Sequence, residues 1–327
     1  MAGDGFRWRD NPELLRQVQQ LRSEGMSSLK IARAIGMRRP QVDGIILAKG
    51  WERPTASPPW HEPEQLTQAQ EPRVHWHYEA PKQVKTEVSV FLNDLHIPSH
   101  DKDAVRVALN LISYVKPKTV FLMGDIFDFY QLSRFDKNPS RLTHLQDDLN
   151  ELYDFFIDLR KACGDAEIHY MEGNHEHRLT AYLWKHPESA GLDALQPEAL
   201  FRLGHWGIHW HRQEETYVHH GFLVTHGSIV RKHAGYSARG EFEKYTASGI
   251  SGHTHRSAAV PKTTMGGVYA WYENGCLCNL RPEYIVGVPD WQHALSIGHF
   301  VEGDDRFSID QIQMPGHKIL YRGLLFA

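Results

Sequence analysis

The chain has 327 residues, of which 23% are charged and 41% hydrophobic, a balance typical of globular proteins. Its apolar runs are strand-sized and fall short of the roughly 18 residues of a membrane span, so we expect no membrane partner. The formal net charge of −4 is uneven: residues 1–53 hold ten Lys/Arg and six Asp/Glu and so carry +4, which leaves −8 for residues 54–327. The N-terminus lacks a signal-peptide pattern and the three cysteines do not suggest a disulfide framework, so we expect a cytoplasmic protein.

The first predicted elements are three short helices within residues 11–51. Apolar residues recur at helical spacing, Gly25 and Gly36 end the first two helices, and the third begins near Arg38. Three short helices with a glycine turn between the last two are typical of a helix-turn-helix module. The sequence therefore predicts a small all-α domain over residues 1–53.

The basic residues of the third helix indicate what this domain binds. In helix-turn-helix proteins the second helix of the pair enters the major groove of DNA, which here would bring Arg38, Arg39 and Lys49 to the nucleic acid. We therefore predict DNA as a partner. The alternative is a helical module that docks on another protein or forms a homodimer, since such modules often pair.

Residues 54–85 contain repeated prolines in polar sequence without a period, which predicts a semi-extended linker. From about Thr86 buried strands and amphipathic helices alternate. Strands are predicted at 88–92, 119–123, 167–171, 222–225, 246–250, 268–273, 293–301 and 318–326, and helices at 103–114 and 142–163. The first part has the pattern of βαβ units and the second that of an antiparallel set, which predicts an α/β (α+β) domain over residues 86–327.

Polar residues recur where these strands end, and ligands gather beyond the carboxyl ends of strands in α/β sheets. The residues are Asp94, His96, Asp125, Asp128, Asn174, His175, His226, His253 and His255. Carboxylate, amide and imidazole ligands suit divalent ions such as Mn²⁺, Fe²⁺ or Zn²⁺. Two such ions roughly 3.5–4 Å apart can promote an in-line displacement at phosphorus. Each motif alone is also common in structural turns, so the prediction of a two-metal site depends on the whole ordered set.

This ordered set resembles the calcineurin-like metallophosphoesterase family. The motifs are Asp94-Leu95-His96, Gly124-Asp125-Ile126-Phe127-Asp128, Gly173-Asn174-His175-Glu176, His226-Gly227 and Gly252-His253-Thr254-His255. The resemblance covers residues 86–327 and implies a β-sandwich flanked by helices. It implies two divalent metal ions per chain, with Mn²⁺ favoured and Fe²⁺, Zn²⁺ or Ni²⁺ as alternatives.

The resemblance also implies a role for each side chain. One ion would be held by Asp94, His96 and His255, the other by Asn174, His226 and His253, and both by Asp125. His175 would remain off the metals and protonate the leaving oxygen or stabilise phosphoryl charge, and Asp128 would orient His175. Two departures bear on the branch: Phe129-Tyr130 replaces the Arg-Gly of the Ser/Thr phosphatase branch, and Glu176 replaces the Asp usual in the nuclease branch.

The function predicted from these patterns is a metal-dependent phosphodiesterase or nuclease acting on DNA. Arg178, Arg231 and Lys232 are candidate contacts to the substrate phosphate, because each follows a metal motif. The alternative is a small-molecule phosphatase, acting on nucleotides or phosphomonoesters, whose N-terminal module docks on a protein. A third reading is a DNA-binding regulator without enzymatic activity.

Overall fold

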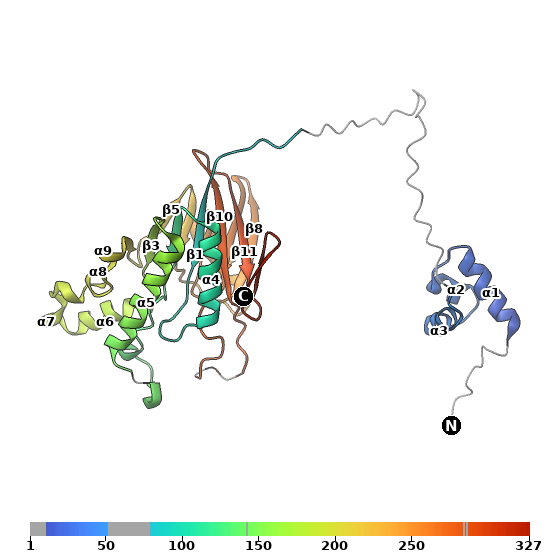
Figure 1. Cartoon of the computed structure of the whole chain (residues 1–327), viewed down its shortest axis with the longest axis horizontal. Helices are drawn as coiled ribbons and strands as arrows, with labels where there is room; N and C mark the ends of the chain where they lie inside the picture. The colour runs from blue at the N-terminus through green and yellow to red at the C-terminus, as the bar shows by residue number, and fades with distance from the viewer. Residues whose placement is uncertain (1–10, 52–78, 142, 284, 286) are drawn as a thin grey trace. The chain divides into compact units, whose positions relative to one another are not determined.

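The computed structural model describes residues 11–51, 79–141, 143–283, 285 and 287–327. The chain divides into two compact units after Pro81, and Figure 1 shows the elements of each. Most of the predicted linker, residues 54–85, lies outside the described residues, which include only 79–85 of it.

The N-terminal unit consists of α1 (Pro12–Ser23), α2 (Ser28–Ala34) and α3 (Arg39–Lys49). Asn11 and Ser27 start the first two helices, because their side-chain oxygens accept the backbone N–H groups of Leu14 at 3.1 Å and Lys30 at 3.4 Å. The apolar faces of the three helices form a core of their own from Val18, Ile31, Ala32, Val42 and Ile45. The predicted helices are therefore present, whereas binding of DNA by this unit stays a prediction.

The C-terminal unit contains two main sheets. The six-stranded sheet has the order β11 (Phe307–Gln313), β10 (Ala294–Val301), β1 (Thr86–Leu92), β2 (Thr119–Leu122), β3 (Glu167–Met171) and β4 (Ile208–His211). The five-stranded sheet has the order β5 (Tyr217–His219), β6 (Phe222–Thr225), β7 (Gly249–Ser251), β9 (Gly267–Asn274) and β8 (Ser257–Thr264). A separate ribbon pairs β12 (Ile319–Tyr321) with β13 (Leu324–Phe326).

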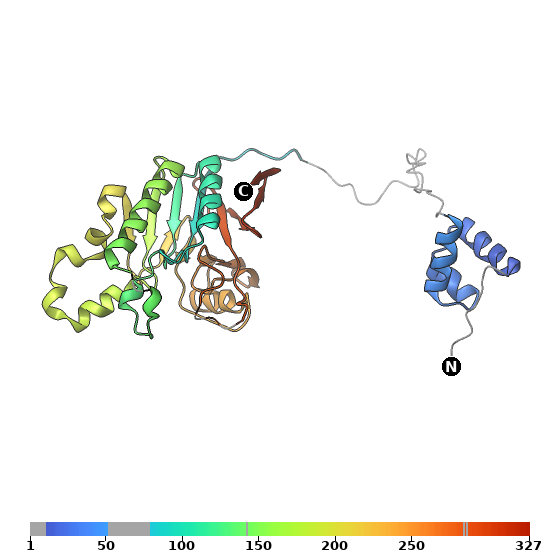
Figure 2. The same ribbon diagram turned by 60° about the horizontal axis from the view of Figure 1, so that its bottom comes forward.

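The two sheets pack face to face through apolar side chains that both contribute. This core consists of Phe91, Phe121, Met123, Met171, Phe222, Val224, Ile250 and Phe300. The outer face of the six-stranded sheet is covered by α4 (Lys102–Val115) and α5 (Leu145–Cys163), as Figures 1 and 2 show. Because β1 and β2 lie between helices and the second sheet, both of their faces are largely buried, and their sequences are mostly apolar, with Ser89 interrupting the apolar run of β1.

Further helices complete the unit. A lobe follows β3 and contains α6 (His177–Lys185), α7 (Pro187–Ala190), α8 (Pro197–Leu200) and α9 (Leu203–Trp206), and α10 (Tyr236–Tyr245) packs on the five-stranded sheet. The short 3-10 helices η3 (Tyr130–Leu132), η4 (Pro139–Arg141) and η5 (Asp193–Leu195) lie in loops. The mixed α/β fold predicted from the sequence is thus confirmed, with two packed sheets flanked by helices.

Some predicted elements differ from the structure. The strand predicted at 318–326 is the hairpin of β12 and β13, because Arg322 and Gly323 adopt positive φ angles of 49° and 80° and reverse the chain. The strand predicted at 246–250 begins only at Gly249, since Thr246 ends α10 with a φ of 54°. None of the helices in the described ranges combines the length and apolar character that a membrane-spanning helix needs.

Candidate metal centre

The carboxyl ends of five strands meet at one edge of the sandwich. β1, β2 and β3 run parallel in one sheet, and β6 and β7 run parallel in the other. Their following loops carry all nine predicted residues of the site: Asp94, His96, Asp125, Asp128, Asn174, His175, His226, His253 and His255. The parallel pairing therefore brings together side chains that lie up to 161 positions apart in the sequence (94 to 255).

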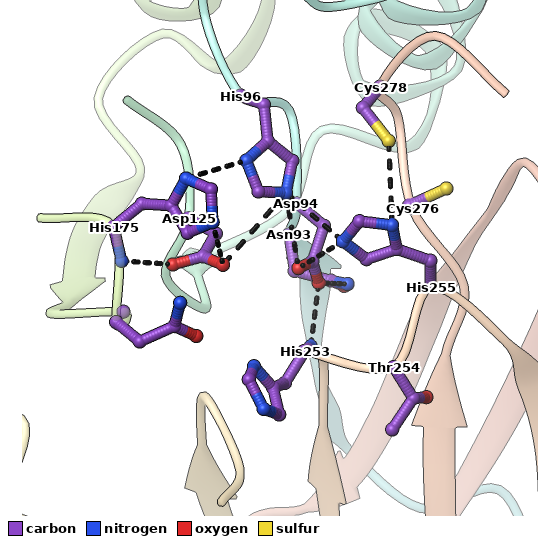
Figure 3. Close-up of polar contacts among 12 residues, drawn as sticks. Asn93, Asp94, His96, Asp125, His175, His253, Thr254, His255, Cys276 and Cys278 are labelled. Atoms are coloured by element: carbon purple, nitrogen blue, oxygen red, sulfur yellow. Dashed lines mark hydrogen bonds and ion pairs between the residues drawn. The ribbon is translucent and has the colours of Figure 1, made fainter. Parts of the chain in front are cut away.

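The first group of donors contains Asp94, His96 and His255, all of them buried (Figure 3). Nε2 of His255 lies 3.1 Å from Oδ1 of Asp94 and 3.0 Å from Nε2 of His96. Nε2 of His96 lies 3.7 Å from the same Asp94 oxygen. Three donor atoms from two loops, those after β1 and β7, thus face one small space.

The second group surrounds Nε2 of His226. This atom lies 3.1 Å from Oδ1 of Asn174, 3.2 Å from Nδ1 of His253 and 3.4 Å from Oδ2 of Asp125. The same Asp125 oxygen is 3.9 Å from Nε2 of His96 in the first group. Oδ2 of Asp125 therefore faces both groups, the position that an oxygen shared by two ions must take.

The chemistry of these donors fits a pair of divalent cations. Oδ1 of Asp94 is buried and accepts no hydrogen bond within the described part of the chain, and two pairs of imidazole nitrogens face each other at hydrogen-bond distance. Burial opposes charge on His226, yet the Asp125 and Asp94 carboxylates raise the pKa of this imidazole to about 10. The site therefore takes up positive charge, and mixed oxygen and nitrogen donors suit Mn²⁺, Fe²⁺ or Zn²⁺.

The backbone around the site is strained in a way that serves its geometry. Asp94, His96, Asp125, His253 and His255 have φ angles of 52°, 55°, 52°, 68° and 59°, in the left-handed region that side chains other than glycine rarely adopt. Each such turn directs a donor into the centre instead of continuing the strand. Neighbouring glycines leave the room needed: a Cβ atom on Gly252 would lie 2.5 Å from Oδ2 of Asp94.

His175 and Asp128 form a pair beside the two groups. Nδ1 of His175 donates to Oδ1 of Asp128 at 2.7 Å, and Nε2 lies 3.8 Å from Oδ2 of Asp125. Arg178 joins the pair, since its Nη1 donates to the same Asp128 oxygen at 2.8 Å and its Nη2 donates to Nε2 of His175 at 3.0 Å. Burial lowers the pKa of His175, and a ring nitrogen that accepts from arginine carries no proton. His175 is therefore neutral in this arrangement.

Glu176 is a structural residue of the centre that sequence reasoning did not identify. Its fully buried carboxylate accepts hydrogen bonds from the backbone N–H groups of Asp125, Phe127 and Gly173, each at 2.9 Å. Burial and the neighbouring Asp125 carboxylate raise the pKa of Glu176 to about 7. The only signal in the sequence is its position directly after His175. No local pattern shows that Glu176 binds the backbone of the loop after β2.

Two further side chains hold the first group and were also missed. Asn93 donates to the Oδ2 oxygen of Asp94 and to the backbone oxygen of Gly275. Cys278, one of the three cysteines that suggested no disulfide framework, places its sulfur 3.7 Å from Nδ1 of His255 (Figure 3). Each orients a donor of the first group from behind.

The remaining predicted contacts lie elsewhere or are engaged. Arg231 and Lys232 are exposed, and within the described residues neither side chain forms a hydrogen bond or ion pair. In the N-terminal unit Arg38, Arg39 and Lys49 are exposed on or beside α3, and Arg39 pairs with Asp43 at 3.4 Å. The structure thus brings only Arg178, of the predicted phosphate contacts, into the centre.

Comparisons with known proteins give relatives but no matching family model. The chain is 26% identical over 246 residues to the Gene 54 protein of Mycobacterium phage D29, which covers 68% of this chain and 96% of that protein. It is 28% identical over 137 residues to the UDP-2,3-diacylglucosamine hydrolase of Porphyromonas gingivalis, and this match covers 39% of this chain and 48% of that protein.

The search of solved structures gives matches with low sequence identity. A dimetal phosphatase from Danio rerio is 12% identical with a TM-score of 0.38, covering 69% of this chain and 95% of that chain. Vacuolar Protein Sorting 29 from Cryptosporidium parvum is 12% identical with a TM-score of 0.39, and the match covers 73% of this chain and 94% of that chain. The ordered motifs, the mixed α/β sandwich and the curated relatives confirm the resemblance of this chain to the calcineurin-like metallophosphoesterase family.

Proposed function

We propose that the chain is a two-metal phosphoester hydrolase whose substrate is a phosphodiester of DNA. The observation that supports this most directly is the convergence of two donor groups on one oxygen of Asp125, with His175 and Asp128 beside them. One ion would be held by Asp94, His96 and His255, the second by Asn174, His226 and His253, and both by Asp125. When bound, such ions polarise the phosphoryl group and lower the pKa of water.

In this proposal His175 would protonate the leaving oxygen. Asp128 holds its Nδ1–H, which directs Nε2 toward Asp125. Because His175 is neutral here, it must take up a proton at Nε2 before it can donate one, and Asp128 would stabilise the charged ring. Arg178 would then release Nε2 and become free to donate to a phosphoryl oxygen.

The first test measures metal content and turnover of the whole chain together. With Mn²⁺ we expect cleavage of bis-p-nitrophenyl phosphate and of DNA. His175→Asn should abolish turnover, while the metal content stays at about two ions per chain, as expected for a two-metal site. Loss of metal in this variant would contradict the role of His175, and a metal-saturated chain inert on all phosphoesters would favour the non-enzymatic reading.

Binding of DNA by the N-terminal unit is the second part of the proposal. Its support is the net charge of +4 over residues 1–53 and the exposure of Arg38, Arg39 and Lys49 at α3. Replacing these three by alanine in the whole chain should weaken a gel shift on duplex DNA and reduce its salt dependence. Arg16→Ala, at an exposed position on α1, is the matched control. Equal gel shifts for the unmodified chain, the triple variant and the control would show that this unit does not bind DNA through these residues.

The second candidate is hydrolysis of a nucleotide or another small phosphate compound. It is favoured by the partial match to a curated hydrolase of UDP-2,3-diacylglucosamine. A panel of monoesters, nucleotide diphosphate diesters and DNA separates the candidates. Higher kcat/KM on the small compounds, together with no effect of the Arg38, Arg39 and Lys49 substitutions, would favour this reading.

A further inference from the structure

Arg141 is a basic side chain near the metal centre to which the proposed mechanism assigns no role. It ends η4, and only 22% of its side chain is exposed. The guanidinium carbon lies 4.5 Å from the centre of the Tyr130 ring, and Nη2 donates to Oγ of Ser99 at 2.5 Å. The Tyr130 hydroxyl accepts the backbone N–H of Asn138 at 2.6 Å, which ties η4 to the same ring. These contacts hold the guanidinium in one orientation.

The charges around Asp128 do not balance. Its Oδ1 oxygen lies 2.7 Å from Nδ1 of His175 and 2.8 Å from Nη1 of Arg178. Its Oδ2 oxygen lies 3.9 Å from Nη2 of Arg141. Because arginine is always charged and the shorter contacts of Asp128 are to the other two residues, one carboxylate cannot neutralise both guanidinium groups. Asp128 therefore does not neutralise the positive charge of Arg141, and only the Asp128 side chain lies between Arg141 and His175.

A carboxylate from another segment lies over this charge. Oε1 of Glu283 is 3.7 Å from Nη1 of Arg141 and accepts a hydrogen bond from Nδ2 of Asn138 at 3.0 Å. The Glu283 side chain is 45% exposed, and exposed ion pairs contribute little to stability. An anionic oxygen of a ligand can therefore replace the Glu283 oxygen on these donors without a large cost.

We propose that Arg141 and Asn138 form a subsite for a second phosphate group of the substrate, next to the phosphate that reacts. The proposal rests on the proposed function, since it concerns the substrate of that site. A guanidinium offers paired donors that match phosphate oxygens, and a substrate with two neighbouring phosphates gains contacts that a single phosphodiester lacks. Both a polynucleotide and a nucleoside bisphosphate have this chemistry.

The experiment measures ligand binding by the whole Mn²⁺-loaded chain with titration calorimetry, and every variant carries His175→Asn so that the probes are not hydrolysed. The probes are thymidine 5′-monophosphate, thymidine 3′,5′-bisphosphate and the dinucleotide pTpT. Arg141→Ala should weaken binding of the bisphosphate by about tenfold to a hundredfold, the usual effect of charge-assisted hydrogen bonds, and that of the monophosphate by less than about twofold. Glu283→Ala should act in the opposite direction and tighten binding of the bisphosphate, because it frees the two donors.

Two control variants show whether the loss of affinity depends on the paired donors of Arg141. Arg134→Ala removes an arginine before η4 whose guanidinium lies 5.4 Å from the Phe135 ring, and should leave all three affinities unchanged. Arg141→Lys keeps the charge without the paired donors and should give an intermediate loss. It also serves if Arg141→Ala does not fold. Tighter binding of pTpT than of the bisphosphate indicates a polynucleotide site and the reverse a nucleotide site, and either supports the subsite.

Equal weakening of the monophosphate and the bisphosphate by Arg141→Ala would overturn the proposal, since Arg141 would then only support Asp128. An unchanged affinity for the bisphosphate in both Arg141→Lys and Glu283→Ala would also overturn it. Binding does not require turnover, so failure of the two proposals can be told apart. If the chain binds the bisphosphate more tightly than the monophosphate through Arg141 but cleaves no ester, only the proposed function is wrong. If it cleaves esters but Arg141 does not affect binding of the bisphosphate selectively, only the proposed subsite is wrong.

Discussion

Replacing Glu176 by alanine tests how the metal centre is held in place before any ion binds. The carboxylate is fully buried and accepts four hydrogen bonds. Its Oε2 oxygen accepts the backbone N–H groups of Asp125 and Gly173, both at 2.9 Å. Its Oε1 oxygen accepts the N–H of Phe127 at 2.9 Å and the hydroxyl of Tyr170 at 2.7 Å. Glu176 thereby joins the loop after β2, which carries Asp125, to the loop after β3.

The expected loss of stability follows from these four contacts. Alanine leaves four buried donors without an acceptor, and each orphaned group costs about 1–3 kcal/mol. Water that enters the new cavity can satisfy some of them, so we expect the lower part of that range, about 4–6 kcal/mol. Glu176→Gln should lose less, about 1–3 kcal/mol, because it keeps one acceptor oxygen and removes a charge that the Asp125 carboxylate repels.

The assay is urea unfolding of the metal-free chain at pH 8, followed by circular dichroism, with metal content measured separately on the native protein. Glu302→Ala is the matched control, since this exposed glutamate pairs with Lys85 at 2.7 Å and should change stability by less than about 1 kcal/mol. We expect Glu176→Ala to unfold at lower urea and to retain less metal. An unfolding midpoint equal to that of the control would refute the reasoning.

Two further predictions concern the metal ligands and the response to acid. Cys278→Ala removes the partner of Nδ1 in His255 and should lower the affinity for one ion by about 10–100-fold, whereas Cys276→Ala should not change it. Elemental analysis of the dialysed variants measures the metal that each retains. Equal losses of metal in the two variants would contradict this role of Cys278. Burial lowers the pKa of His169 and of His219 to about 4, so the unfolded state binds more protons below the ordinary pKa of 6.5. Stability of the metal-free chain should therefore fall as pH drops from 6.5 to 4, by about 1–2 kcal/mol per histidine after allowance for solvent, and substitution of both by glutamine should flatten this slope in urea titrations.

Much of the fold could be predicted because its signals are local. The apolar runs that became β1, β2 and β3 are buried on both faces, so their composition identified them as strands of a covered sheet. The helices α6 to α10 were missed. Four of them have only 4 to 9 residues, and α10 has only four buried side chains, too few for a clear helical period.

The candidate site divides in the same way. Residues that follow strands and sit in ordered motifs, such as Asp125 and His226, could be proposed from sequence, since the ends of parallel strands meet at one sheet edge. Glu176 and Arg141 could not. Glu176 acts through backbone groups of another loop, and Arg141 reaches Asp128 from 13 positions further along the chain.

The sequence by itself determined the kinds of donor available and their order along the chain, because side-chain chemistry and strand patterns are written locally. Only the tertiary structure decided which atoms face each other. The pairing of β1 with β2 and of β6 with β7 places Oδ2 of Asp125 between two histidine groups, and the left-handed turns at the ligands aim each donor inward. These distances depend on packing between segments far apart in sequence, which no local pattern contains.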